Sequence, residues 1–283
     1  MRVMLAQVAP TLGDMTKNVK IHRECIDRAI NESADLLLFP ELSLTGYFVR
    51  DLVPEVSLSL ESQVMGEFVE LSKRISIAFG FVEETRDFHF YNSAVYLQDG
   101  LIKHVHRKVY LPTYGMFDEA RYFAQGDRIR AFDTRFGRFA MLICEDAWHP
   151  SAVYVAVMDS ADYLLFLSSS PARGVGRHAI SSGEAWETLN RMNAELYGCY
   201  VFYTNRAGQE EGVSFWGGSE IVLPNGQLLI KAPYFQEACL AAEVDTREIR
   251  RSRLITPISR DENIDLTLRE LIRIYEERFE GKY

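Results

Sequence analysis

Cysteine is scarce in this chain of 283 residues, and its four copies, Cys25, Cys144, Cys199 and Cys239, lie far apart. They form no C-x-x-C pair and no small secreted frame, so a disulfide framework is not expected. We expect reduced thiols and a cytoplasmic location. Long apolar runs are also missing. None approaches the ~20 residues needed to cross a bilayer, and the first ten residues lack the core and cleavage site of a secretory signal.

Positive charge is in deficit, because 31 Lys and Arg face 40 Asp and Glu, giving a net charge of −9. This balance argues against nucleic acid or an anionic membrane as a general partner. The chain also lacks the G-x-S-x-G, H-E-x-x-H, Walker A and G-x-G-x-x-G motifs. His104 and His106 alternate along a predicted strand, but no third metal ligand follows at a suitable spacing, so we expect exposed strand histidines. Neither a metal nor a cofactor is expected.

Short apolar strands alternate with amphipathic helices along almost the whole chain, with no linker, repeat or low-complexity segment. The predicted strands are 2–9, 35–39, 76–82, 92–98, 101–107, 138–143, 163–167, 199–204, 214–223, 227–231 and 238–243, and the predicted helices are 16–32, 56–74, 151–159, 181–197 and one from 267 onward. About a dozen strands exceed what one open sheet comfortably holds. The pattern therefore predicts an α/β fold with two stacked, mixed sheets and helices on the outside.

Cys144 is the most informative residue, because an apolar, alternating stretch over 136–143 ends abruptly in this thiol and is followed by Glu145 and Asp146. A packing cysteine would normally be followed by further apolar sequence. A thiol at the end of a strand is in the position of a nucleophile, since chemistry in α/β proteins gathers outside strand ends. The two adjacent carboxylates predict a thiol pKa above the usual ~8.5, so the nucleophile would need a base or a nearby cation.

Two other strand ends supply a base and a cation. Glu41 follows the apolar run 36–39 and lies among apolar residues, where partial burial would bring its pKa toward working pH. Lys108 follows a predicted strand and precedes the aromatic segment 109–117, which indicates that its amine points into a lined cavity. Taken alone, either residue is most often an ordinary surface residue. Glu119 is either a carboxylate that holds Lys108 or the first turn of a short helix.

Three ordered segments, 39–47 (FPELSLTGY), 107–112 (RKVYLP) and 144–148 (CEDAW), resemble the signature regions of the nitrilase superfamily of carbon–nitrogen hydrolases. Two later segments, 205–208 (NRAG) and 215–226 (FWGGSEIVLPNG), are similar to later motifs of that superfamily. The match covers most of the chain, from about residue 2 to 245. Three ordered motifs on strand ends are far more specific than any one of them alone.

Within the superfamily, the segment 111–123 (LPTYGMFDEARYF) and the LTGY that ends at Tyr47 most resemble the glutaminase domain of glutamine-dependent NAD synthetase. The resemblance implies an αββα sandwich that dimerises. It also implies that Tyr47, Tyr114 and Trp148 lie near the substrate, with Ser169 or a neighbour contacting the amide-bearing group.

The resemblance divides the chain into a carbon–nitrogen hydrolase domain over 1–255 and a C-terminal arm and helix over 256–283, which is expected to contact a second subunit. The chain ends near where a synthetase half would begin, and it has no ATP-pyrophosphatase S-G-G loop. We therefore do not expect it to synthesise NAD alone. It is expected to act as a free-standing amidase or as a glutaminase subunit of a separate synthetase, in a homodimer or a multiple of one.

The predicted reaction is hydrolysis of a carboxamide C–N bond, of an omega-amide or glutaminase type, releasing ammonia through a thioester. Glu41 would take the proton of Cys144, while Lys108 and the backbone N–H of Glu145 stabilise the oxyanion. Two alternatives stay open. One is a nitrilase or N-carbamoyl amidohydrolase that uses the same trio on a nitrile or carbamoyl substrate, and the other is a non-catalytic subunit that binds a partner.

Overall fold

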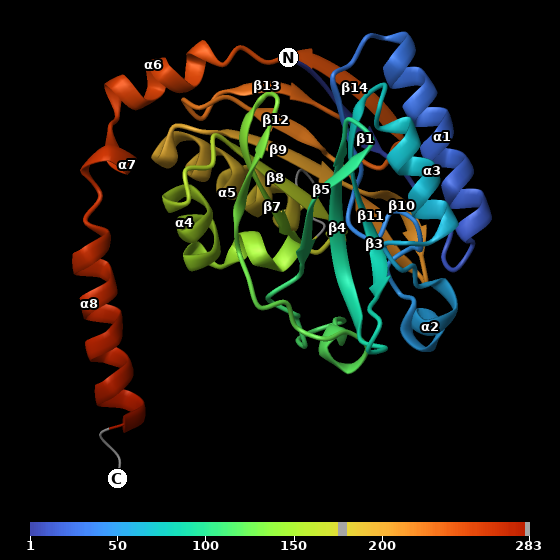
Figure 1. Ribbon diagram of the computed structural model, residues 1–283, viewed down its shortest axis with the longest axis horizontal. Helices are drawn as coiled ribbons and strands as arrows, with labels where there is room; N and C mark the ends of the chain where they lie inside the picture. The colour runs from blue at the N-terminus through green and yellow to red at the C-terminus, as the bar shows by residue number, and fades with distance from the viewer. Residues whose placement is uncertain (175–179, 281–283) are drawn as a thin grey trace.

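The structure, a computed structural model, describes residues 1–174 and 180–280. Two six-stranded sheets are stacked face to face at its centre, with helices on the outer faces of both (Figure 1). The prediction of an α/β sandwich of two mixed sheets is confirmed.

The first sheet combines strands of the N-terminal part of the chain with one late strand. Its strands are β1 (Arg2–Gln7), β2 (Leu36–Leu38), β3 (Ser76–Glu84), β4 (Phe90–Gln98), β5 (Leu101–Arg107) and β14 (Ala238–Glu243). Their order across the sheet is β14-β1-β2-β3-β4-β5. The central strands β1, β2 and β3 are parallel, and the pairings of β14, β4 and β5 are antiparallel.

The second sheet repeats this arrangement with later strands. Its strands are β6 (Ala131–Thr134), β7 (Gly137–Ile143), β8 (Tyr163–Ser168), β9 (Tyr200–Asn205), β12 (Glu220–Val222) and β13 (Leu228–Lys231). Their order is β13-β12-β9-β8-β7-β6, with β7, β8 and β9 parallel and the other pairings antiparallel. A separate hairpin joins β10 (Ala207–Glu210) to β11 (Val213–Trp216).

Helices cover the outer faces of both sheets. The α-helices are α1 (Met15–Asn31), α2 (Val53–Val56), α3 (Gln63–Leu71), α4 (Pro150–Met158), α5 (Ser181–Tyr197), α6 (Arg247–Ile255), α7 (Ile258–Asp261) and α8 (Ile264–Tyr275), with short turns η1 (Arg50–Leu52), η2 (Glu119–Arg121), η3 (Cys144–Trp148) and η4 (Glu276–Glu280). Figure 1 shows α1 and α3 over the first sheet, and α4 and α5 lie over the second.

The alternation of side chains along the strands explains the layers. In β1, Val3 and Leu5 point between the two sheets, whereas Met4 and Ala6 pack in the layer beneath α1. Successive strand residues point to opposite faces, so an uninterrupted apolar strand serves both layers. Each large apolar side chain buried in this way contributes about 1.5–3 kcal/mol relative to an exposed one.

Two predicted elements are wrong in detail. The helix expected over 56–74 begins only at Gln63, because Leu58 runs extended beside β3 and packs its side chain into the core beneath α1 and α3. The strand expected over 214–223 is broken at Gly217 and Gly218, whose φ angles of 71° and 64° are left-handed. The break lets β11 leave the second sheet and pair with β10.

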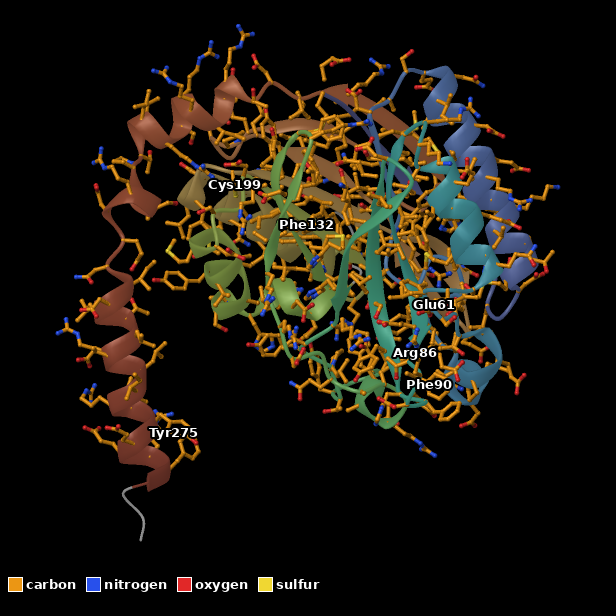
Figure 2. The ribbon with its side chains drawn as sticks, in the orientation of Figure 1. Glu61, Arg86, Phe90, Phe132, Cys199 and Tyr275 are labelled. Atoms are coloured by element: carbon orange, nitrogen blue, oxygen red, sulfur yellow. The ribbon has the colours of Figure 1, made fainter. Side chains whose placement is uncertain are left out.

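The C-terminal segment leaves the sandwich after β14. In α6, Ile249 still packs against the layer between the sheets, and the Ser252 hydroxyl donates to the carbonyl of Pro224 at 2.7 Å. Beyond it, α8 extends away from both sheets, with no buried residue among those it contains (Figure 1). Leu271 and Tyr275 on its apolar face are 59% and 57% exposed, and Figure 2 shows Tyr275 far from the sandwich.

Candidate active site

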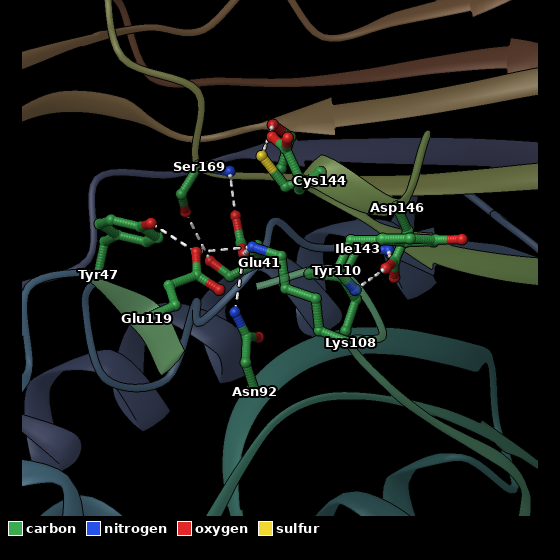
Figure 3. Close-up of polar contacts among 12 residues, drawn as sticks. Glu41, Tyr47, Asn92, Lys108, Tyr110, Glu119, Ile143, Cys144, Asp146 and Ser169 are labelled. Carbon is green, nitrogen blue, oxygen red and sulfur yellow. Dashed lines mark hydrogen bonds and ion pairs between the residues drawn. The ribbon is translucent and has the colours of Figure 1, made fainter. Parts of the chain in front are cut away.

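Glu41, Lys108 and Cys144 all come shortly after strands. Lys108 and Cys144 directly follow β5 and β7, and Glu41 comes three residues after β2. Because β2 and β5 belong to one sheet and β7 to the other, the three side chains approach each other from both layers (Figure 3). The structure therefore brings together the three residues that the sequence singled out.

Glu41 is held by three donors. Its Oε1 accepts hydrogen bonds from Asn92 Nδ2 at 2.8 Å and from Lys108 Nζ at 2.7 Å, and its Oε2 accepts one from the Ser169 N–H at 2.7 Å. Gly80 allows this packing, because a Cβ there would lie 2.3 Å from the backbone nitrogen that follows Glu41. The buried carboxylate thus has a fixed orientation, which a carboxylate acting on a neighbouring group requires.

Lys108 lies between two carboxylates. Its Nζ donates to Glu41 and to Glu119 Oε1, each at 2.7 Å, and its side chain is fully buried. Burial lowers the pKa of Lys108, but the charges of Glu119 and Glu41 outweigh it and hold that pKa well above its usual value. Lys108 is therefore an ammonium at any physiological pH. Both interpretations of Glu119 hold, because this residue contacts Lys108 and also begins the short turn η2.

Glu119 is the second carboxylate of the cluster. Its Oε1 also accepts from the Tyr47 hydroxyl at 2.5 Å. Burial raises the pKa of Glu119 to about 7, against the opposing effect of Lys108 and with a further contribution from Glu41. Near neutral pH the cluster can therefore gain or lose a proton at Glu119 while Lys108 stays charged.

Cys144 has an unusual backbone conformation for a non-glycine residue. Its φ of 46° is left-handed, a strain that costs on the order of 1–3 kcal/mol and recurs at functional sites. The Ser168 hydroxyl lies 3.4 Å from its Sγ. Burial and then the charge of Glu41 raise the pKa of Cys144, and Lys108 only partly offsets them. The resting residue is a neutral thiol, as the sequence predicted. The charge that raises its pKa most is that of Glu41, and not those of Glu145 and Asp146, to which the sequence pointed.

Asp146 anchors the site, a role that the sequence did not reveal. Its Oδ1 accepts from the N–H groups of Val109 and Tyr110 at 2.9 Å, and its Oδ2 accepts from the Ile143 N–H at 3.0 Å and contacts His106 Nε2 at 2.8 Å. The carboxylate thereby joins the residue before Cys144 to the residue after Lys108. The prediction of an exposed His106 is wrong, because a 2% exposed imidazole completes this anchor.

A cavity of about 410 Å³ opens onto Cys144. Its lining residues are Tyr114, Phe117, Cys144, Glu145, Trp148, Ser170, Pro171, Arg173, Gly174, Ser181, Ser182, Ala185 and Trp186. Glu145, Tyr114 and Trp148 thus lie where a substrate would reach the thiol, and the Tyr114 hydroxyl donates to Glu145 Oε2 at 2.9 Å. The cavity combines the charged groups of Glu145 and Arg173 with four aromatic side chains and several small residues, and small-molecule sites commonly place a few polar groups among aromatic ones.

Two predicted substrate residues lie beside this cavity rather than in its lining. Ser169 is fixed to Glu41 through its N–H, and its hydroxyl donates to the Glu41 carbonyl at 2.9 Å, whereas the neighbouring Ser170 lines the cavity. Tyr47 lines a second cavity of about 220 Å³ on the side of Glu119. A larger cleft of about 500 Å³, near Arg107, holds none of the three strand-end residues.

Over 1–174 and 180–280, no cluster of three or more His, Cys, Asp or Glu residues is arranged to hold a metal ion. No helix in those ranges is both long and apolar enough to span a bilayer. His104, expected to be exposed, is partly buried and stacks on Phe132 at 4.3 Å between ring centroids.

The sequence profile described as carbon-nitrogen hydrolase matches residues 2–254. The chain belongs to the carbon–nitrogen hydrolase family. This hydrolase is 32% identical over 254 residues to a curated glutamine-dependent NAD(+) synthetase from Acinetobacter baylyi, a match that covers 89% of this chain and 46% of the relative. It thus spans less than half the length of the curated NAD synthetases it matches.

Solved structures support the assignment of this chain to the carbon–nitrogen hydrolase family. The glutamine-dependent NAD+ synthetase from Acinetobacter baumannii, in complex with ADP, aligns with a TM-score of 0.78 at 32% identity over 88% of this chain and 46% of that one. A carbon-nitrogen hydrolase from Helicobacter pylori aligns with a TM-score of 0.86 at 25% identity over 96% and 98% of the two chains. The similarity to these enzymes and the family match identify the protein as a carbon–nitrogen hydrolase enzyme.

Proposed function

We propose that the protein hydrolyses a carboxamide C–N bond, with Cys144 as nucleophile, Glu41 as proton acceptor and Lys108 as the fixed positive charge. The observation that carries this proposal is a neutral thiol, in a cavity, beside a carboxylate and an ammonium that are already paired. A thiol whose pKa is raised needs a base at the moment of attack, and Glu41 lies close enough to affect that pKa.

The proton follows a simple path in the proposed reaction. Glu41 Oε2 accepts one hydrogen bond from Ser169 and has lone-pair capacity for the proton of Cys144. As the sulfur attacks the amide carbon, Lys108 and the backbone N–H of Glu145 stabilise the oxyanion. Glu41 then returns the proton to the departing ammonia, leaving a thioester. A water molecule that Glu41 deprotonates hydrolyses the thioester, and the thiol recovers its proton.

Typical magnitudes indicate how much each group of this set can contribute to the rate. Positioned proton transfer contributes about 10²–10⁴-fold, and one oxyanion donor contributes about 10²–10³-fold. Glu119 does not touch the reacting atoms in this scheme. It holds the Lys108 ammonium in position through the 2.7 Å contact, and Asp146 holds the backbone on either side.

An omega-amide of glutamine type is the substrate that we propose. The relatives are named glutamine-dependent NAD synthetases, and the cavity carries opposite charges that complement a free amino acid. Glu145 would attract the α-ammonium and Arg173 the α-carboxylate, while the side-chain amide reaches Cys144. Tyr114 and Trp148 would enclose the methylene groups, with Tyr47 and Ser169 supporting the cluster behind the thiol.

Ammonia release from a panel of substrates tests the proposal. Glutamine, asparagine and short aliphatic amides should give ammonia with the wild-type protein and no turnover with Cys144→Ala, and Cys199→Ala is the matched control. Wild-type ammonia release by Cys144→Ala would contradict the mechanism. Release of CO₂ with the ammonia from a carbamoyl substrate, or turnover of a nitrile alone, would favour the N-carbamoyl amidohydrolase or nitrilase alternative. A folded protein that turns over no substrate of the panel would favour the non-catalytic, partner-binding alternative.

For assembly, we propose that residues 1–255 form the hydrolase domain and that the arm over 256–283 contacts a second copy of the chain. The exposed apolar face of α8 supports this, although residues 281–283 lie outside the described part. A separate synthetase that uses the released ammonia is a further proposed partner, supported by relatives of about twice this length. The free thiols are compatible with a cytoplasmic location.

A further inference from the structure

Two cysteines outside the site lie in contact with one another. Cys25 is on α1 and Cys239 is on β14, and their sulfur atoms are 3.7 Å apart. Both are partly exposed, and both pack at the border of the apolar layer beneath α1. Cys239 lies opposite Ala6 of β1 in the register of the sheet. The pair therefore faces solvent where the first helix covers the edge of the first sheet.

We propose that Cys25 and Cys239 form a reversible disulfide when the protein meets an oxidant of the hydroperoxide class. A disulfide bond is about 2.05 Å long, so the two sulfurs need to approach by about 1.7 Å from their present separation. Two unbranched side chains in contact can supply this through small χ1 rotations. No other described pair of cysteines makes such a contact.

The environment selects Cys239 as the thiol that reacts first. The Arg28 guanidinium donates to the Cys239 carbonyl at 3.3 Å. The hydrogen bond with Cys25, together with the charge of Arg28, lowers the pKa of Cys239, whereas the same sulfur contact and burial raise the pKa of Cys25. Burial, and then the charges of Glu32 and Glu237, oppose this effect at Cys239 without reversing it. The thiolate is the reactive form of cysteine, so Cys239 is favoured.

The reaction balances with one equivalent of hydroperoxide. The Cys239 thiolate attacks a peroxide oxygen, the O–O bond breaks, and the leaving oxygen departs as water or an alcohol. This gives a sulfenic acid at Cys239. The Cys25 sulfur then attacks that sulfenic sulfur, and the hydroxyl leaves as water. The two thiols lose two hydrogens and two electrons in total, and a dithiol reductant reverses the change.

The bond would tie α1 to the edge strand β14, between residues 214 positions apart in the chain. Cross-links that close long loops restrict the unfolded chain most, so the oxidised protein should melt about 5–10 °C higher than the reduced one. Neither sulfur contacts the cluster of Glu41, Lys108 and Cys144. The disulfide would therefore raise the thermal stability of the protein and leave its catalytic activity unchanged.

Peroxide titration of the Cys144→Ala protein tests the proposal. The substitution removes the thiol of the cavity, which would otherwise compete for the peroxide. After hydrogen peroxide and denaturing alkylation, only Cys199 should take up the label, and a peptide pair joined through Cys25 and Cys239 should weigh two hydrogens less than its components. Dithiothreitol should restore three labelled thiols and reverse the rise in Tm. Cys25→Ser and Cys239→Ser should each show neither the cross-link nor the rise.

Two results would contradict the proposed disulfide. Three labelled thiols after a peroxide dose that fully oxidises free glutathione would overturn the proposal. Separate sulfinic or sulfonic acids on Cys25 and Cys239, without a cross-linked peptide, would overturn it as well. Should one serine variant fail to fold, the other variant and the labelling of the Cys144→Ala protein still decide the question. The outcome does not depend on the substrate of the enzyme.

Discussion

Replacing Asp146 by Asn should damage both the stability and the activity of the protein. The carboxylate receives two backbone N–H groups on Oδ1, and on Oδ2 one N–H and the imidazole of His106. An Asn side chain keeps one acceptor oxygen and presents an NH₂ group where two donors already point. One orientation of the amide loses two contacts and the other at least one, because a neutral His106 can switch tautomer and accept from the NH₂ group. Hydrogen bonds to a buried charged group are worth about 1.5–3 kcal/mol each, so the expected loss is about 1.5–6 kcal/mol.

Urea unfolding followed by circular dichroism measures this loss directly. Asp127→Asn is the matched control, because Asp127 is 76% exposed and forms, among the described residues, an ion pair with Arg128 alone, so its change should stay within about 0.5 kcal/mol. Where Asp146→Asn remains folded, kcat should fall, since the backbone beside Cys144 and Lys108 loses its common anchor. A variant within 0.5 kcal/mol of the wild type, with unchanged kcat/KM, would refute the reasoning.

Three further predictions follow from the same structure. Lys108→Met should lower kcat by at least about 100-fold in an ammonia assay while circular dichroism stays native, because Glu119 can take up a proton. Burial raises the pKa of Glu220 to about 7 from 4.5, so this residue should lower the free energy of unfolding by about 3 kcal/mol as pH rises from 4.5 to 7, and Glu220→Gln should reduce the fall measured in urea titrations by that amount, leaving the contribution of Glu119. Leu271→Asp should convert a dimer to a monomer in light scattering, whereas an unchanged mass would exclude α8 from the interface.

The layered fold was largely predictable because apolar periodicity reports burial on both faces of a strand. The runs at β1, β7 and β8 face helices on one side and the other sheet on the other, and each was predicted within a few residues. The break at Gly217 and Gly218 was harder to place, because buried apolar residues stand on both sides of it, Phe215 and Trp216 before and Ile221 and Val222 after. Leu58 was misassigned for a related reason, since a residue that packs inward from an extended chain looks like part of a helix face.

The meeting of Glu41, Lys108 and Cys144 was also predictable, because each residue type stood at the end of a predicted strand. The supporting contacts were not. Asp146 reads in the sequence as one of two acids after a thiol, and only the tertiary structure shows that it turns away to bind four donors while Glu145 faces the cavity. The contact between Cys25 and Cys239 joins positions 214 residues apart, and no local pattern carries such information.

Rapid quenching followed by mass spectrometry of the intact protein tests the central claim most directly. With a turned-over carboxamide, the protein should carry a transient adduct equal to the substrate minus ammonia, located on the peptide that contains Cys144 and removed by hydroxylamine. The adduct should be absent from Cys144→Ala. Steady ammonia release with no adduct at any quench time, or with an adduct on another residue, would contradict nucleophilic catalysis by this thiol.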